Sequence, residues 1–141
     1  MSWDPKRALR ECAYITYLRA DLLPGEKGRY YCAHNTIVIS RALNQAGRRC
    51  ALTHELIHAE TRDEQVNAPL FEAKRERAVD REAARRLIPI ERLIEALLWS
   101  CDPHEIADEL WVDLDTLEMR CGSLSEDERT AILARLREEY A

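Results

Sequence analysis

Two histidines and a glutamate near the middle of the chain have the residue types and the spacing of a metal site. The run His54-Glu55-Leu56-Ile57-His58 puts two imidazoles four residues apart. In a helix this spacing places both rings on one face, one turn apart, where they can bind a single tetrahedral Zn²⁺. Glu55 then lies beside them, where a carboxylate can act as general base on water at the metal. The motif predicts a zinc-dependent hydrolase centred on these three side chains.

A catalytic zinc needs a third protein ligand, and the acidic residues downstream of the motif can supply it. The extended pattern HExxHxxGxxH is absent, because Thr61 and Glu64 stand where it requires Gly and His. Glu76 and Asp80 follow His58 by 18 and 22 residues and are separated from each other by one helical turn. We therefore expect the third ligand to come from a second helix.

The helical register of Glu76 and Asp80 supports this expectation. The two carboxylates share one stripe of their helix with three apolar residues, Val79, Ala83 and Leu87. Because an uncompensated buried carboxylate is costly, such a stripe is explained by a cation opposite it, and the alternative is ordinary ion pairs with the nearby arginines. One acidic residue would bind the metal, and the other would accept a hydrogen bond from a ligand histidine. In one arrangement Glu76 binds the metal and Asp80 supports it, and the two roles can be exchanged.

Four segments in the first two thirds of the chain are expected to position these residues. Apolar spacing after Asp4-Pro5 predicts a helix over residues 5–22, and the run 28–40 predicts two short strands joined by a turn. The motif itself lies in an expected helix over 48–60. After a polar loop, a second helix over 71–88 ends before Pro89, which cannot donate a hydrogen bond into a continuing helix.

The remainder of the chain is expected to be helical. Residues 90–100 are amphipathic, and 104–124 predict two short helices with a break near Val112-Asp113. A last helix follows over 123–140, with Ser125 as N-cap and Glu128 completing a capping box. The fold class is therefore α+β and mostly α. We expect a core over residues 1–95 and a helical extension over 96–141 that packs on it.

The charge distribution argues against nucleic-acid binding by this extension. Residues 1–99 carry 17 basic and 14 acidic side chains, whereas residues 100–141 carry 4 basic and 12 acidic ones. The paired short helices are typical of a helix-turn-helix, but the second helix offers Arg120 alone against three acidic residues, Asp113, Asp115 and Glu118. Because such a surface repels phosphates, we interpret the segment as a packing or protein-docking element.

The cysteine content and the hydropathy of the chain indicate in which cellular compartment the protein is expected. The five cysteines are odd in number, lie far apart and include no CxxC pair, which indicates reduced thiols. The chain opens with no leader-like pattern and has no apolar run of the roughly 18 residues that span a bilayer. We expect a cytoplasmic protein without membrane contact.

Three segments resemble a known family of zinc peptidases. The runs NTIVIS at 35–40, RRCALTHELIHAE at 48–60 and ERAVDREAARRLIP at 76–89 are similar to the core of ImmA/IrrE-type metallopeptidases. The likeness covers about residues 28–95 and is closest to the short forms of actinobacteria and their phages. It implies a zincin-like fold with a gluzincin-type site. In that site His54, His58 and Glu76 would bind Zn²⁺, with Glu55 as catalytic base and Asp80 in support.

The resemblance also implies a substrate class. Several relatives cut helix-turn-helix repressors of a phage, a mobile element or a stress regulon, so a DNA-binding repressor is the expected protein substrate. One alternative is a zincin-fold module that binds a repressor through its acidic helices without cutting it. A third interpretation treats the HExxH motif as coincidence in a helical structural protein, in which case both histidines are ordinary helix residues.

Overall fold

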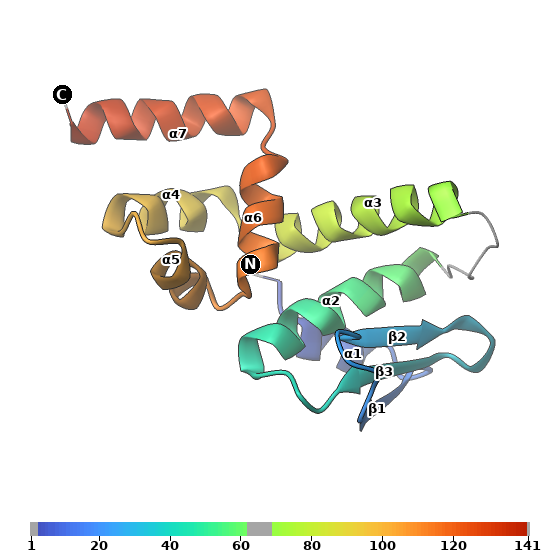
Figure 1. Ribbon diagram of the computed structural model, residues 1–141. Helices are drawn as coiled ribbons and strands as arrows, with labels where there is room; N and C mark the ends of the chain where they lie inside the picture. Colours follow the sequence, from blue (N-terminus) through green and yellow to red (C-terminus); the bar gives the residue numbers. More distant parts are fainter. Residues whose placement is uncertain (1–2, 62–68, 141) are drawn as a thin grey trace.

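A computed structural model describes residues 3–61 and 69–140, a small sheet flanked by helices (Figure 1). The sheet contains β1 (Thr16–Ala20), β2 (Gly28–Tyr31) and β3 (Thr36–Ser40). The first three helices are α1 (Pro5–Glu11), α2 (Gln45–Thr61) and α3 (Pro69–Leu87). The other four are α4 (Ile90–Trp99), α5 (Pro103–Leu110), α6 (Leu114–Gly122) and α7 (Glu126–Glu139). The predicted fold class, α+β and mostly α, is confirmed.

The first predicted helix is wrong in its extent. Asp4 caps α1 as expected, accepting hydrogen bonds from the backbone amides of Lys6 and Arg7, but the helix ends at Glu11 rather than near Leu22. The β-branched and aromatic run Ile15-Thr16-Tyr17 favours extended backbone, and β1 forms there. Strand β1 pairs in parallel with β3, a contact from a distant segment that outweighs the helical spacing of the apolar residues.

The two strands predicted over residues 28–40 are confirmed. Strands β2 and β3 pair antiparallel and are joined by a short 3₁₀ turn (Cys32–His34), after which Asn35 takes a left-handed conformation at φ 46°. The strand order is β1-β3-β2, so β3 is central and β2 is an edge. Ile37 and Ile39 of β3 are fully buried against α2, which fixes the sheet on the motif helix.

The helices on either side of the candidate site form as predicted. Helix α2 contains the whole motif, and α3 stops at Leu87, before Pro89. The loop expected between them, at residues 61–69, lies almost entirely outside the described residues. Within the described ranges, no helix combines the length and the apolar character needed to cross a membrane.

The C-terminal helices pack on the core through a shared apolar cluster. Cys50 of α2 and Leu87 of α3 belong to the same buried cluster as Leu93, Ile106 and Leu117 of the later helices. The predicted break between α5 and α6 is confirmed, and so is the capping box at the start of α7, where the Ser125 hydroxyl and the Glu128 side chain bond each other's backbone amides. Helix α7 lies at one end of the molecule (Figure 1). The division of the chain at residue 95 stays a prediction.

Candidate metal centre

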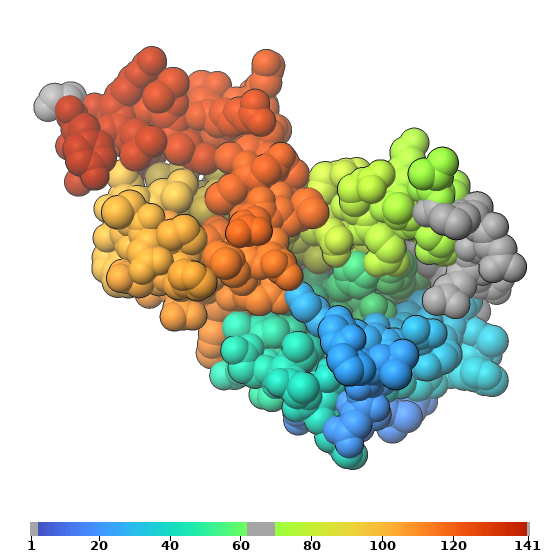
Figure 2. Space-filling model, in the orientation of Figure 1, coloured from blue at the N-terminus to red at the C-terminus, as the bar shows by residue number. Residues whose placement is uncertain are grey.

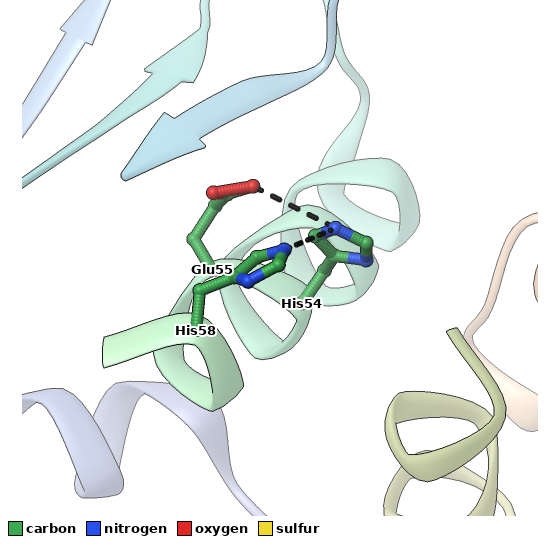
Figure 3. Close-up of side chains that lie close together, drawn as sticks. All are labelled: His54, Glu55 and His58. Carbon is green, nitrogen blue, oxygen red and sulfur yellow. Dashed lines mark hydrogen bonds and ion pairs between the residues drawn. The ribbon is translucent and has the colours of Figure 1, made fainter. Parts of the chain in front are cut away.

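Helix α2 presents the three motif residues to one region of space. The ligand atoms of His54, Glu55 and His58 all lie within 4.8 Å of one another. The Nε2 atoms of the two histidines are 3.2 Å apart, and an oxygen of Glu55 lies 3.9 Å from Nε2 of His54 (Figure 3). Glu55 and His58 are buried, with 6% and 7% of their surface exposed. The helical spacing therefore brings the two imidazoles together as the sequence predicts.

Helix α3 brings Glu76 against both imidazoles. One carboxylate oxygen of Glu76 lies 2.8 Å from Nε2 of His54, and the other lies 2.8 Å from Nε2 of His58. Its side chain is 45% exposed, so solvent reaches the cluster from this side. Two nitrogen donors and one carboxylate from two helices thus converge on one point.

Asp80 occupies a different position from Glu76. Its Oδ1 lies 2.8 Å from Nδ1 of His54, the ring nitrogen that points away from the convergence point. A carboxylate there can accept the Nδ1–H hydrogen bond and fix the tautomer in which Nε2 carries a free lone pair. The structure therefore brings all five predicted site residues together and places the two acidic ones on opposite edges of one imidazole.

The donor set fits a small tetrahedral cation. A Zn²⁺ ion with bonds of about 2.0–2.1 Å holds its ligand atoms roughly 3.3 Å apart. The separations among the Nε2 atoms of His54 and His58 and the nearest Glu76 oxygens are 2.8–3.2 Å. Two imidazoles and one carboxylate are also a common ligand set for catalytic zinc, which leaves a fourth position for water or substrate.

The electrostatics of the cluster favour a cation at this point. Burial works against a charged His54, but hydrogen bonds to Asp80 and Glu76 outweigh it and raise the pKa of His54 to about 10. Hydrogen bonds from the two histidines lower the pKa of Glu76 well below its usual range. Burial raises the pKa of Glu55. With three carboxylates around two imidazoles, a positive charge at the site, carried by a proton or a metal ion, is strongly stabilised.

A close backbone approach places the sheet edge directly on Glu55. Gly28 begins β2, and a Cβ at this position would lie 2.9 Å from Cδ1 of Ile39 and 3.3 Å from Cγ of Glu55. The absence of a side chain therefore lets the edge strand lie close to Ile39 and to the Cγ methylene of Glu55. The spacing of the motif gives no signal for this contact.

These elements enclose an open cleft of about 630 Å³. Its walls are residues 25–30 before and within β2, the motif face of α2, the acidic face of α3 and the start of α6. Figure 2 shows the recess with α2 at its base, between the strands in blue, α3 in yellow-green and α6 in orange. The cleft therefore has Glu55, His54 and His58 among its lining residues.

At the α6 end of the cleft, Lys27 forms ion pairs that the sequence does not reveal. Lys27 lies 3.1 Å from a carboxylate oxygen of Asp115 and 3.5 Å from one of Asp113. Although burial opposes it, these two carboxylates raise the pKa of Lys27. The partners are 88 residues apart in the case of Asp115, and a single sequence gives no signal for such a pair.

A helical HExxH motif opposite a carboxylate helix, beside a small sheet, is the arrangement of a metallopeptidase-type protein. Residues 11–121 match the family model described as IrrE N-terminal-like domain, Peptidase M78. The chain belongs to this family. Searches of curated proteins and of solved structures gave no significant match. The family confirms the resemblance found in the sequence and supports a metallopeptidase-type function, while the ligand roles of individual residues stay predictions.

Proposed function

We propose that the protein is a zinc-dependent endopeptidase. The observation that carries the proposal is the convergence of both histidine Nε2 atoms and both oxygens of Glu76 within 3.2 Å. His54, His58 and Glu76 would hold the ion, and Asp80 would orient His54. Bound Zn²⁺ supplies a Lewis acid that polarises the scissile carbonyl and lowers the pKa of water to near 7.

Glu55 is proposed to move the proton. Its carboxylate lies beside the two imidazoles and is held by its buried position and by contact with Gly28. Burial raises the pKa of Glu55, which brings a carboxylate closer to the range where a general base is effective near neutral pH. The carboxylate would take a proton from the attacking water and pass it to the nitrogen of the leaving amine.

The position of β2 at the edge of the described sheet supports a peptide as substrate. Strand β2 pairs with β3 on one side, and residues Gly28, Arg29 and Tyr30 line the cleft. An extended peptide can add to such an edge through main-chain hydrogen bonds, which carry affinity with little sequence preference. A peptide bound there passes directly over Glu55.

We propose a DNA-binding repressor as the protein that is cut. Such a protein carries a basic surface for phosphates. The segment 100–141, with 4 basic and 12 acidic residues, offers a complementary charge. Attraction between opposite charges raises the rate at which two proteins meet, and this enhancement becomes smaller as the salt concentration increases.

The test combines metal analysis with product analysis. Purified protein should hold one zinc per chain, and incubation with a repressor encoded beside it should give new termini by mass spectrometry. Glu55→Gln should retain zinc but lose about 10²- to 10⁴-fold in cleavage rate. Absence of stoichiometric zinc, or full cleavage by Glu55→Gln, would refute the proposal. Binding of the repressor without cleavage, unchanged in Glu55→Gln, would favour the non-cleaving module.

A further inference from the structure

The N-terminal segment, which precedes the family match at residue 11, reaches the back of the motif helix. The indole N–H of Trp3 donates to the hydroxyl of Thr53 at 2.9 Å, and that hydroxyl donates in turn to the carbonyl of Arg49. Thr53 is fully buried and directly precedes His54. Trp3 also packs against both main apolar clusters. It therefore fixes this face of α2.

The same indole ring covers an ion pair that links α2 to α3. The guanidinium of Arg86 lies 5.0 Å from the centre of the Trp3 ring. Two of its nitrogens bond the two carboxylate oxygens of Glu60 at 2.7 and 2.8 Å. A bidentate pair of this kind fixes both distance and orientation, and the ring removes water from one side of it. We call Trp3, Arg86 and Glu60 the brace.

The brace and the metal site lie on opposite edges of one helix pair. At 100° per residue, Ile57 falls between the His54–His58 face of α2 and the face that carries Thr53 and Glu60. On α3, Val79 and Ala83 fall in the same way between the Glu76–Asp80 face and Arg86. Ile57, Val79 and Ala83 form the small buried apolar cluster between the helices.

We propose that the brace sets the register of α3 against α2, so that the Glu76 carboxylate meets both imidazoles. This inference rests on the proposed zinc site. Trp3 is a positioning residue in it, because it touches neither the ligands nor the cleft. The packed cluster contains one large side chain, Ile57, between two smaller ones. A displacement of about 1 Å at a site has large effects, so a contact that fixes α3 against α2 bears on the ligand geometry.

Zinc affinity, measured by competition with a chromophoric chelator, tests the proposal. Trp3→Ala should weaken zinc binding by about 10-fold, the lower end of the range for lost outer partners. Trp3→Phe keeps a ring over Arg86 and should lose less. Glu128→Gln, in the α6–α7 contact, is the matched control: it should lower the unfolding midpoint and leave the affinity unchanged. Wild-type affinity in Trp3→Ala, or an equal loss in the control, would overturn the proposal.

A second measurement decides the point without zinc. The two substitutions Trp3→Ala and Glu76→Gln are combined in a double-mutant cycle, and urea unfolding of the metal-free protein is measured for each variant. We expect the effect of the double substitution on the unfolding constant to differ from the product of the two single effects by more than about threefold. Residues without contact or shared partners are usually additive within about twofold, so coupling reports the register of the helices. Additivity would refute the brace even if the protein binds zinc. If the wild type takes up no zinc, the proposed function fails, and the cycle still decides the brace.

Discussion

Two of the places where acidic and basic side chains meet in this molecule have opposite outcomes. Between α6 and α7, Arg120 is 2% exposed, its Nε donates to the carbonyl of Ile88, and its two terminal nitrogens bond both oxygens of Glu128. Between α2 and α3, three carboxylates surround two imidazoles. The first contact is balanced by the chain's own charges. The second is balanced only when a proton or a metal ion adds positive charge.

This difference in charge balance distinguishes a structural ion pair, Arg120–Glu128, from a candidate metal site. A guanidinium keeps its charge at every relevant pH, so the Arg120–Glu128 pair needs nothing from solution. Imidazoles are neutral or charged according to their surroundings, and their lone pairs can be given to a metal. A cluster that combines excess carboxylate with imidazole is therefore stable in the presence of a cation, and it is placed where the cleft is open.

The largest expected effect is the loss of a ligand. His58→Ala removes one of the two imidazoles and should weaken zinc binding by more than about 100-fold, beyond the range for outer partners. Zinc per chain after gel filtration, measured by elemental analysis, checks this. His34→Ala is the control, because His34 lies exposed in the turn after β2. Retention of stoichiometric zinc by His58→Ala would mean that the cluster is not the metal site.

The second expected effect is a loss of folding stability without a change in zinc content. Glu128→Ala deprives the buried Arg120 of its carboxylate, and breaking a buried pair costs about 3–5 kcal/mol. Urea unfolding measures the loss, with zinc content as the second reading. Glu138→Ala on the same helix is the control, since its pair with Arg135 is exposed and should contribute about 0–1 kcal/mol. Equal losses in the two variants would contradict the contrast.

The sequence predicts the residues of the candidate site better than the walls of the cleft around it. The spacing of His54 and His58 and the shared stripe of Glu76 and Asp80 depend only on helical geometry, which is local. The capping box at Ser125 is local too, and the structure confirms it. What the spacing leaves open is which acidic side chain meets Nε2, because this depends on the register between two helices.

The features missed by the sequence all depend on contacts between distant segments. Strand β1 forms where a helix was expected, because β3 offers it a parallel partner. Gly28 matters only because β2 lies on Glu55, and Lys27 only because α6 returns to the cleft. Trp3 is separated by 50 residues from its hydrogen-bond partner Thr53. Periodicity and capping rules carry no information on such pairs.

A smaller effect on zinc affinity should come from Asp80, the proposed hydrogen-bond partner of His54. Asp80→Asn keeps the shape of the side chain at Nδ1 of His54 but removes its charge. Zinc affinity should fall by about 10- to 100-fold, as for other outer-shell partners, with stoichiometry preserved at high zinc. Glu95→Gln, exposed on α4, is the control. A wild-type affinity in Asp80→Asn would show that His54 needs no support, and a loss well beyond about 100-fold would show that the two carboxylates have exchanged roles.

The last expected effect is a pH dependence of the balanced contact. Hydrogen bonds from Arg120 lower the pKa of Glu128 to about 2. A carboxylate with a lowered folded pKa stabilises the protein above its unfolded value, and this stabilisation is lost as the pH falls toward the folded value. The unfolded chain binds the proton first, so between about pH 4.5 and 2 the free energy of unfolding should fall by up to about 1.4 kcal/mol per pH unit from this group.

Chemical denaturation of the wild type and Glu128→Gln across this range isolates that slope, because every other acidic group is common to both chains. Both series are run with excess chelator, so that loss of zinc at low pH does not enter. The wild type should be more stable at pH 6, and the two curves should converge as the pH approaches 2. A constant difference in unfolding free energy over the whole range would show that Glu128 contributes through packing alone, and the contrast between the two contacts would lose its electrostatic basis.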